Sequence, residues 1–383
     1  MKINVNEERL ASSFITLCEI DSPSREEGAV AHYLKERFAE LGCEEFFEDD
    51  SAAVTGSNCG NLFFRFAGNN AKEPIFLNCH MDTVEPSRGV KVRFQGGIFT
   101  SSSDTILGSD DKSGIAAILE AMRLVREYDI DIRPIDLVFT TCEEIGLLGA
   151  KALDTQNIRA KMGYALDSSG FGKVIIGAPA CNHFTVTVRG VAAHAGLHPE
   201  WGVNAITLAA RAMAQVPNGR IDPESSVNIG VISGGAAVNI VPEKVVVEGE
   251  VRSHSRKTLE ELTRRVTTPF REVVDQWCDP TGVVKGKPEV EIEVTESFPL
   301  MSIGHDAPVL TEIEASAKVI GLELEYGVAG GGSDANIFSG KGLPTAIVAT
   351  GMTHVHSTDE QVSLEDMTRL TQLVLALMAA DRE

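Results

Sequence analysis

The sequence has no long hydrophobic run and few basic residues. No apolar segment approaches the roughly 18–20 residues that span a bilayer, and the N-terminal stretch MKINVNEERLASSF lacks the apolar core of a secretory signal. Acidic residues outnumber basic residues 55 to 34, which gives a formal charge of −21. Because nucleic acids and anionic membranes repel such a surface, we expect neither as a partner.

Cysteine pairs are also lacking. The seven cysteines are odd in number, scattered, and never spaced as CxxC. This pattern argues against a disulfide scaffold and a cysteine zinc site, and it favours reduced thiols. We therefore expect a cytoplasmic protein. Its acidic surface is compatible with a protein that holds cations.

The remaining composition is that of a globular protein, and 383 residues predict two or three domains. In the first half, segments with helical periodicity alternate with short apolar strands, which predicts a mainly parallel sheet with helices on both faces. The helical segments are 24–41 and 112–126, and the strands are 75–77, 135–139 and 164–166.

The pattern changes near Ala178, where one-sided strands begin and the order becomes β-α-β-β-α-β. After Pro299, segments with helix and strand patterns alternate again, and Ser363 is expected to cap the last helix. We therefore expect an α/β domain formed by 1–177 and 300–383, with a second domain, 178–299, inserted in it.

Acidic and histidine residues gather where the predicted strands end. In open α/β sheets, ligands bind at that edge. Each segment alone has an ordinary explanation as a surface turn or helix cap, but five of them together favour a metal centre. The segments are His80-Met81-Asp82, Gly108-Ser109-Asp110-Asp111-Lys112, Cys142-Glu143-Glu144, Asp167 and His354-Val355-His356.

The residue types indicate the chemistry. Adjacent Glu143 and Glu144 point in opposite directions, so one can bind a metal while the other takes a proton from water. Asp82 projects to the same side as His80, so it can orient that imidazole, or both can face one ion. Imidazoles and carboxylates without a thiolate suit Zn²⁺, Co²⁺ or Mn²⁺.

In order and spacing, these segments resemble the motif set of the M20 metallopeptidases over nearly the whole chain. The stretches LGSDDKSGIAAI and FTTCEEIGLLGAK resemble its peptidase T (tripeptide aminopeptidase) branch. The resemblance implies an αβα sandwich catalytic domain with a mixed sheet and an inserted ferredoxin-like α+β domain, which acts as a lid and in dimerisation.

The resemblance also implies two divalent metal ions, Zn²⁺ or alternatively Co²⁺ or Mn²⁺. Asp82 would orient a ligand, and Glu143 would be the general base that activates a bridging water. The implied ligands are Asp110 between the ions, His80 and Asp167 at one ion, and Glu144 and His356 at the other. Asp111 is expected to serve the start of the helix.

Further segments resemble the parts of the family that hold the substrate. His194 in GVAAHAG would steady the oxyanion. Asn239 and Arg252 would grip a substrate carboxylate, which suits the planar guanidinium. The glycine loop with Gly331, Gly332 and Ser333 would approach the substrate. In some relatives the lid histidine comes from a partner subunit, so a homodimer is compatible with the sequence.

We therefore expect a two-metal-dependent hydrolase that cleaves amide bonds of short peptides, a zinc-dependent exopeptidase of the tripeptide aminopeptidase type. The alternative is an N-acyl amino acid deacylase or desuccinylase that uses the same centre. A non-catalytic metal-holding protein is disfavoured, because every ligand and base position is present.

Overall fold

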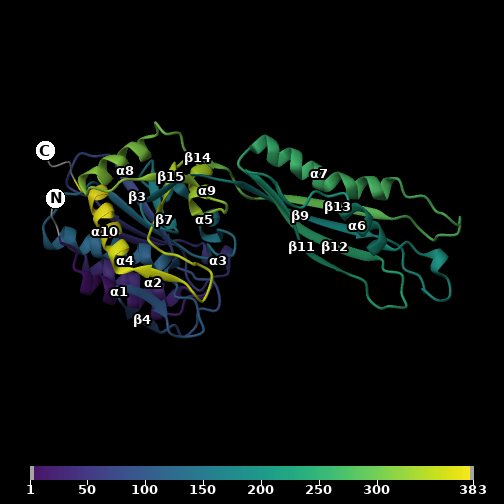
Figure 1. Cartoon of the computed structure of the whole chain (residues 1–383), viewed down its shortest axis with the longest axis horizontal. Helices are drawn as coiled ribbons and strands as arrows, with labels where there is room; N and C mark the ends of the chain where they lie inside the picture. Colours follow the sequence, from purple (N-terminus) through teal and green to yellow (C-terminus); the bar gives the residue numbers. More distant parts are fainter. Residues whose placement is uncertain (1–3, 380–383) are drawn as a thin grey trace. The chain divides into compact units, whose positions relative to one another are not determined.

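The computed structural model describes residues 4–379. Within them the chain forms two compact units, which divide between Ala178 and Pro179 and again between Leu300 and Met301 (Figure 1). These division points lie one residue from those expected from the sequence. No helix among the described residues combines the length and apolar character needed to cross a bilayer.

The first unit is built on a mixed sheet. Its strands follow the order β1-β2-β6-β3-β7-β16-β8-β14, with β15 paired to β8. The four central strands β6, β3, β7 and β16 are parallel, whereas β2 and β8 run antiparallel to their central neighbours. The strands are β1 (Glu45–Glu48), β2 (Leu62–Phe66), β3 (Ile75–His80), β6 (Ile135–Thr140), β7 (Gly163–Ser168), β8 (Lys173–Ala178), β14 (Met301–Ser302), β15 (Glu325–Val328) and β16 (Thr345–Ala349).

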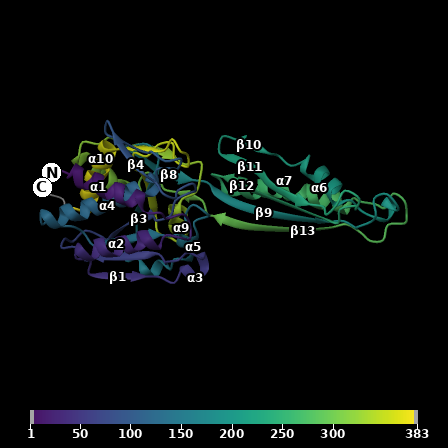
Figure 2. The same cartoon turned by 90° about the horizontal axis from the view of Figure 1, so that it is seen from below.

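Helices and a small three-stranded sheet surround this sheet (Figure 2). The helices are α1 (Glu7–Glu19), α2 (Gly28–Glu40), α3 (Ala52–Thr55), α4 (Ser109–Glu127), α5 (Leu148–Ala152), α8 (Pro308–Val319), α9 (Asp334–Gly340) and α10 (Leu364–Met378). The small sheet, in the order β17-β5-β4, contains β4 (Val92–Gln95), β5 (Ile98–Ser101) and β17 (Gln361–Ser363). Ser363 caps α10 as expected, since its hydroxyl accepts the N–H of Asp366 at 3.0 Å.

Both faces of the central sheet are buried. On β3, Ile75 and Leu77 join the core that includes α1, α2, α4, α8 and α10. Phe76 between them contacts Phe338 of α9, with ring centroids 5.0 Å apart. Because adjacent strand residues point to opposite faces, this alternation places α9 on the face opposite α4. The layers are therefore helix, sheet and helix.

The second unit is a two-layer α+β structure. Its antiparallel sheet has the order β10-β11-β12-β9-β13, and α6 and α7 pack on it. Without β10 the order and the β-α-β-β-α-β succession are those of a ferredoxin-like unit, as expected. The additional edge strand β10 was not predicted. The elements are β9 (Ala180–Arg189), α6 (Ala205–Met213), β10 (Gly219–Asp222), β11 (Ser225–Gly234), β12 (Lys244–Ser253), α7 (Arg256–Asp275) and β13 (Glu289–Phe298).

Candidate metal centre

The parallel strands bring four acidic or histidine segments to one edge of the sheet. His80 is the last residue of β3, Asp167 lies near the end of β7, and Glu144 follows β6. His356 follows β16 and precedes β17. Because parallel strands end at the same edge, residues separated by up to 276 positions in sequence (His80 to His356) can meet there.

Three overlapping groups of three side chains converge at this edge, and Asp110 belongs to two of them. In each group the candidate ligand atoms all lie within 4.8 Å of one another. The groups that share Asp110 are His80, Asp110 and Asp167, and Asp110, Glu144 and His356, and the third is His80, Glu143 and Glu144. The five residues expected as ligands are therefore brought together by the structure.

Asp110 lies between the two imidazoles. Its Oδ1 is 3.0 Å from Nε2 of His80, and its Oδ2 is 3.3 Å from Nε2 of His356. Burial would raise the pKa of Asp110, but the hydrogen bonds to His356 and His80 lower it below its usual range. The carboxylate thus stays ionised, with one oxygen directed to each side, as a bridging ligand requires.

Asp82 holds the turn behind His80. Its backbone oxygen lies 2.9 Å from Nδ1 of His80, and its Oδ1 lies 3.5 Å from the same nitrogen. The Asp82 carboxylate also accepts the backbone N–H groups of Glu143 at 2.9 Å and Glu144 at 3.2 Å. It therefore orients the imidazole and the Glu-Glu pair together, leaving Nε2 of His80 directed at Asp110.

Glu143 is buried beside the two triads. It offers a ligand atom within 4.8 Å of atoms of His80 and Glu144. Burial raises the pKa of Glu143 well above its ordinary value, and the charges of Asp167 and Asp334 add to this effect, while His80 opposes it. A carboxyl group with a raised pKa beside clustered ligand side chains is a candidate for acid–base chemistry.

The donor set itself fits two divalent cations. It contains two imidazoles and three carboxylates, arranged as two groups around a shared carboxylate. Nitrogen and oxygen ligands of this kind suit Zn²⁺, Co²⁺ and Mn²⁺. Buried carboxylates so close together also need compensating positive charge, which two divalent cations would provide.

Comparison with known proteins agrees with this geometry. Residues 76–380 match the family described as Peptidase family M20/M25/M40. The chain belongs to the M20 peptidase family. It is 37% identical over 375 residues to the uncharacterized protein YqjE of Bacillus subtilis (strain 168), with 98% of each chain covered.

Two solved structures of M20-like fold are similar over 98% of this chain and 98% of their own. Aminopeptidase PepT from Bacillus cereus is 37% identical, with a TM-score of 0.87. A tripeptidase from Staphylococcus aureus is 33% identical, with a TM-score of 0.90. These similarities confirm the fold class expected from the sequence.

Strained backbone accompanies this M20 centre. Cys142, His354 and His356 adopt positive φ angles of 54°, 55° and 61°, in the left-handed region that favours glycine. Such conformations cost roughly 1–3 kcal/mol each and cluster at functional sites. The strain at His356 belongs to the turn that directs its imidazole toward Asp110 and Glu144, with Nε2 at 3.1 Å from Oε1 of Glu144.

Glu360 is a positioning residue that the sequence did not reveal, although it lies only four residues after His356. Its buried carboxylate accepts four hydrogen bonds from the segment that carries Asp110. The donors are the backbone N–H groups of Leu107 (2.8 Å), Gly108 (2.8 Å) and Asp110 (3.1 Å) and the hydroxyl of Ser109 (2.6 Å). Glu360 therefore ties the start of α4 to the loop that carries His356.

Glu27 has a similar position behind the Glu-Glu pair and was also missed. It is fully buried and accepts the backbone N–H of Cys142 at 2.9 Å and its thiol at 3.3 Å. Burial raises the pKa of the Cys142 thiol above its ordinary value. The thiol beside the expected base is therefore a packed hydrogen-bond donor.

Asp111 lies in the first turn of α4, at the helix start that it was expected to serve, although its side chain makes no N-cap hydrogen bond there. Its Oδ2 instead accepts the backbone N–H of His80 at 3.3 Å. Gly114 explains how α4 comes so close to the sheet. A Cβ atom there would lie 2.7 Å from Oδ1 of Asp111 and 2.8 Å from Cβ of Leu166. Asp111 thus links α4 to the end of β3.

Ser333 of the glycine loop contacts a candidate ligand of the centre. Its hydroxyl donates to Oδ2 of Asp167 at 2.8 Å. Burial raises the pKa of Asp167 well above its usual range, and the charge of Asp110 adds to this effect. Gly331 and Gly332 are half-buried just before α9. Ser333 therefore supports a candidate ligand, a contact that was not expected from the sequence.

The inserted unit carries the other expected substrate residues. His194 is exposed, and its Nδ1 accepts the backbone N–H groups of Gly196 (3.2 Å) and Leu197 (3.1 Å). A neutral imidazole with an accepting Nδ1 carries its proton on Nε2. The structure also brings Asn239 to the same loop, because its carbonyl accepts the N–H of Ala195 at 2.9 Å.

Arg252 lies on β12 and pairs with Glu250 of the same strand. Its Nε and Nη2 donate to the two carboxylate oxygens at 2.9 Å and 3.0 Å. Burial would lower the pKa of Arg252, but the hydrogen bonds to Glu250 raise it. The guanidinium is thus held charged and oriented, with further N–H groups free of this pair.

Proposed function

We propose that this M20 peptidase uses two divalent cations to release the N-terminal residue of tripeptides. The observation that carries the proposal is the pair of triads that share Asp110. The aminopeptidase PepT of Bacillus cereus and the tripeptidase of Staphylococcus aureus, both more than 30% identical to this chain, support this substrate class. The residue roles that follow belong to the same proposal.

The bound cations would polarise the substrate carbonyl and lower the pKa of the attacking water. His80, Asp110 and Asp167 would hold one ion, and Asp110, Glu144 and His356 the other. We assign zinc because imidazole and carboxylate ligands suit it, with Co²⁺ and Mn²⁺ as substitutes.

Glu143 acts as the base in this mechanism. Its carboxylate takes a proton from the attacking water and later gives it to the leaving amine, so one group serves as base and then as acid. Its raised pKa suits this double task, because the proton it accepts is held long enough to be transferred. Asp82 keeps the backbone of Glu143 in place through its N–H.

The inserted unit supplies the remaining contacts as a lid. His194 donates from Nε2 to the developing oxyanion, which fits the two backbone donors at its Nδ1. Arg252 binds the carboxylate at the C-terminus of the peptide with its planar fork, and Asn239 assists. Gly331 and Gly332 let the substrate backbone approach.

A substrate panel on metal-stripped protein tests this proposal. Zn²⁺, Co²⁺ or Mn²⁺ is added back, and the release of N-terminal residues from dipeptides, tripeptides and tetrapeptides is compared with hydrolysis of N-acyl amino acids. We expect kcat/KM to be highest for tripeptides with a free amino group. A preference for N-acyl amino acids would overturn the proposal and support a deacylase.

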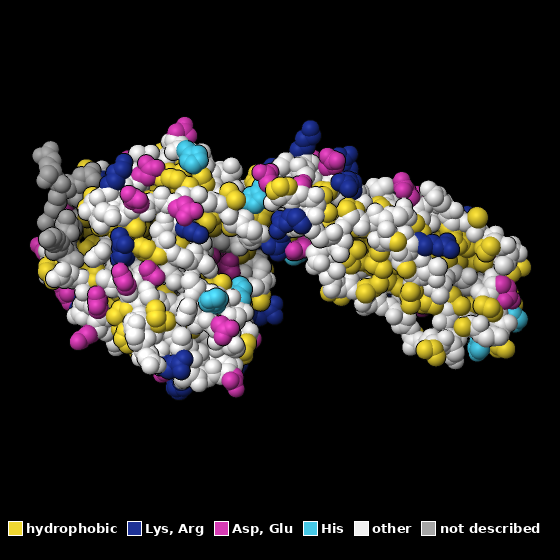
Figure 3. All heavy atoms as spheres, in the orientation of Figure 1, with side chains coloured by type: hydrophobic (Ala, Val, Ile, Leu, Met, Phe, Trp, Pro, Cys, Tyr) yellow, Lys and Arg dark blue, Asp and Glu magenta, His cyan; other side chains and the backbone are white. Residues whose placement is uncertain are grey.

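We further propose that the protein forms a homodimer through the inserted unit. Hydrophobic side chains gather on the visible face of that unit in Figure 3. Exposed hydrophobic residues of this unit include Val231 (52% exposed) and Ile232 (54%) on β11 and Val238 (104%) beyond it. Light scattering during gel filtration measures the mass, and a monomer at micromolar concentration would contradict the dimer. The cytoplasmic location stays a prediction.

A further inference from the structure

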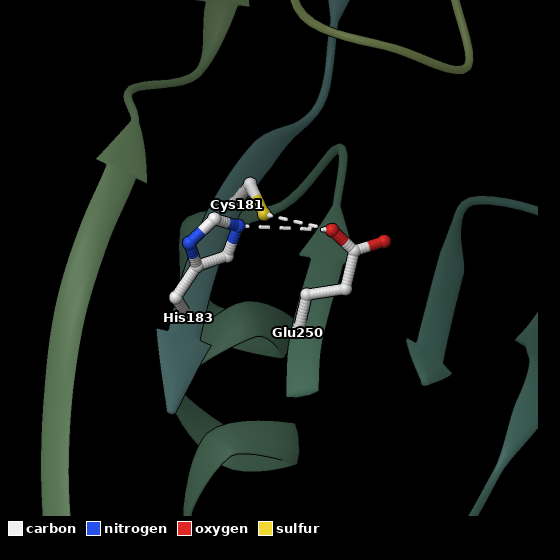
Figure 4. A group of neighbouring side chains, drawn as sticks. All are labelled: Cys181, His183 and Glu250. Atoms are coloured by element: carbon white, nitrogen blue, oxygen red, sulfur yellow. Dashed lines mark hydrogen bonds and ion pairs between the residues drawn. The ribbon is translucent and has the colours of Figure 1, made fainter. Parts of the chain in front are cut away.

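A second group of metal-binding side chains lies within the inserted unit. Cys181 and His183 are two residues apart on β9, and Glu250 lies on the neighbouring strand β12, directly opposite His183 in the register. Residues i and i+2 of a strand point to the same face. Figure 4 shows the thiol, the imidazole and the carboxylate directed toward one another.

The separations of the three ligand atoms are those of a metal site. The Sγ of Cys181 and the Nε2 of His183 each lie 3.8 Å from the same oxygen, Oε2 of Glu250, and all three atoms are within 4.8 Å of one another. Around a tetrahedral ion with bonds of roughly 2.0–2.3 Å, ligand atoms lie about 3.3–3.8 Å apart. A small inward movement would therefore complete three bonds.

One long hydrogen bond joins two of the three side chains, since the Cys181 thiol donates to Oε2 of Glu250 at 3.8 Å. The distance of 3.8 Å between His183 and Glu250 is beyond hydrogen-bond range. Oε2 of Glu250 does accept Nη2 of Arg252 at 3.0 Å. A carboxylate oxygen has two lone pairs, so the same oxygen can accept from Arg252 and bind a cation.

The surroundings allow an ion to enter and be held. Cys181 is fully buried, whereas the side chain of His183 is 56% exposed and that of Glu250 is 28% exposed. An ion can thus arrive from the solvent side and meet the thiol last. With a thiolate and a carboxylate against one guanidinium, the cluster would carry one negative charge before a divalent ion binds.

We propose that Cys181, His183 and Glu250 form a second, mononuclear site for a thiophilic divalent cation such as Zn²⁺ or Co²⁺, with water as the fourth ligand. Binding replaces the S–H bond by an S–metal bond and releases one proton to solvent. Burial raises the pKa of the Cys181 thiol to about 12. The affinity should therefore decrease as the pH decreases.

Cobalt distinguishes this site from the candidate dinuclear centre. The expected dinuclear ligands contain no sulfur, so a thiolate-to-Co²⁺ charge-transfer band in the near ultraviolet reports on the new site alone. Metal-stripped full-length protein is titrated with Co²⁺. We expect a third equivalent of Co²⁺ per chain, and the band should grow as that equivalent binds.

Two variants and a matched control complete the test. Cys181→Ser should abolish the band, and His183→Ala should lower Co²⁺ affinity at this site by more than about tenfold, since loss of even an indirect contact to a ligand costs 10–100-fold. Cys278→Ser, which changes the exposed cysteine of the same unit, should leave the band unchanged. The thermal unfolding midpoint of each variant checks its folding.

Two results would overturn the proposal. One is the absence of a charge-transfer band in the folded wild-type protein, and the other is a band that survives in Cys181→Ser. Neither result bears on peptide hydrolysis, because the dinuclear centre would still bind two ions. Conversely, a protein that shows the band but has no peptidase activity would support this site and contradict only the proposed function.

Discussion

The backbone N–H of Asp110 donates to Oε1 of Glu360 at 3.1 Å, across 250 positions of sequence. The same carboxylate accepts three more hydrogen bonds from residues 107–109. Glu360 lies only four residues after His356. The side chain of Glu360 therefore couples the positions of two candidate ligands, Asp110 at the start of α4 and His356 in the loop after β16.

Glu360→Gln should weaken metal binding. The amide keeps one acceptor oxygen but turns an N–H₂ group toward backbone donors, so the Asp110 segment loses part of its support. We expect the affinity for Zn²⁺ to fall about 10–100-fold, as is usual for supporting residues of metal ligands. Isothermal titration of metal-stripped protein measures the change.

Asp359→Asn is the matched control, because it removes the neighbouring exposed carboxylate. Its metal affinity should equal that of the wild type. Glu360→Ala should also lower the free energy of unfolding, by about 3 kcal/mol or more, since several buried donors lose their acceptor. Wild-type metal affinity in Glu360→Gln would show that the hydrogen bonds only stabilise the fold.

Glu143→Gln should separate chemistry from metal binding. Its amide retains the shape of the side chain but cannot accept the proton, so kcat should decrease by at least about 10²–10⁴-fold. Metal content, measured by elemental analysis, should stay near that of the wild type. An active variant would show that another group is the base.

Asp334→Asn should change how stability depends on pH. Burial raises the pKa of Asp334 to about 6, above the ordinary value of 3.8. The folded state therefore favours the protonated acid, and stability is lost as the pH rises from about 4 to 6. The asparagine variant avoids this loss and should gain up to about 3 kcal/mol relative to wild type at pH 7.

The measurement is denaturant unfolding of metal-stripped protein at pH 4, 5, 6 and 7. Asparagine can still accept the hydrogen bond that Thr140 donates at 2.5 Å, so the substitution is conservative. The exposed substitution Asp50→Asn serves as the control and should not change the pH dependence. A stability difference that is the same at pH 4 and pH 7 would refute the explanation.

Arg252→Lys should weaken recognition of the peptide C-terminus. Lysine keeps the charge but loses the planar fork, and charge-assisted hydrogen bonds contribute about 1.5–3 kcal/mol. We expect kcat/KM for tripeptides to decrease roughly 10–100-fold, mainly through KM. The defect should disappear for C-terminally amidated tripeptides. Arg189→Lys, on the same sheet, should behave like the wild type.

Much of the fold could be predicted because its central strands are continuous apolar runs. Residues 75–77, 135–139 and 164–166 became β3, β6 and β7, with ends displaced by a few residues. In the inserted unit, β9 and β13 were predicted from the alternation of apolar and polar residues. In contrast, β1, β4 and β10 have four residues each and contain no buried residue, so their periodicity carries little information.

The candidate ligands could be predicted for a different reason. Histidines and carboxylates at strand ends are informative because the topology of a parallel sheet decides where they meet. The supporting residues are not, because Glu27 and Glu360 act on backbone N–H groups far away in sequence. An isolated glutamate in a sequence looks like a surface residue, and only the tertiary structure shows its partners.

The inserted unit is joined to the central sheet by two neighbouring strands, β8 and β14, because Ala178 before the insertion pairs with Met301 after it. All five candidate ligands of the shared-aspartate centre lie outside residues 179–300. Under the proposed function, the residues that hold the metal ions and those of the insertion that grip the substrate would therefore reside in separate parts of the chain.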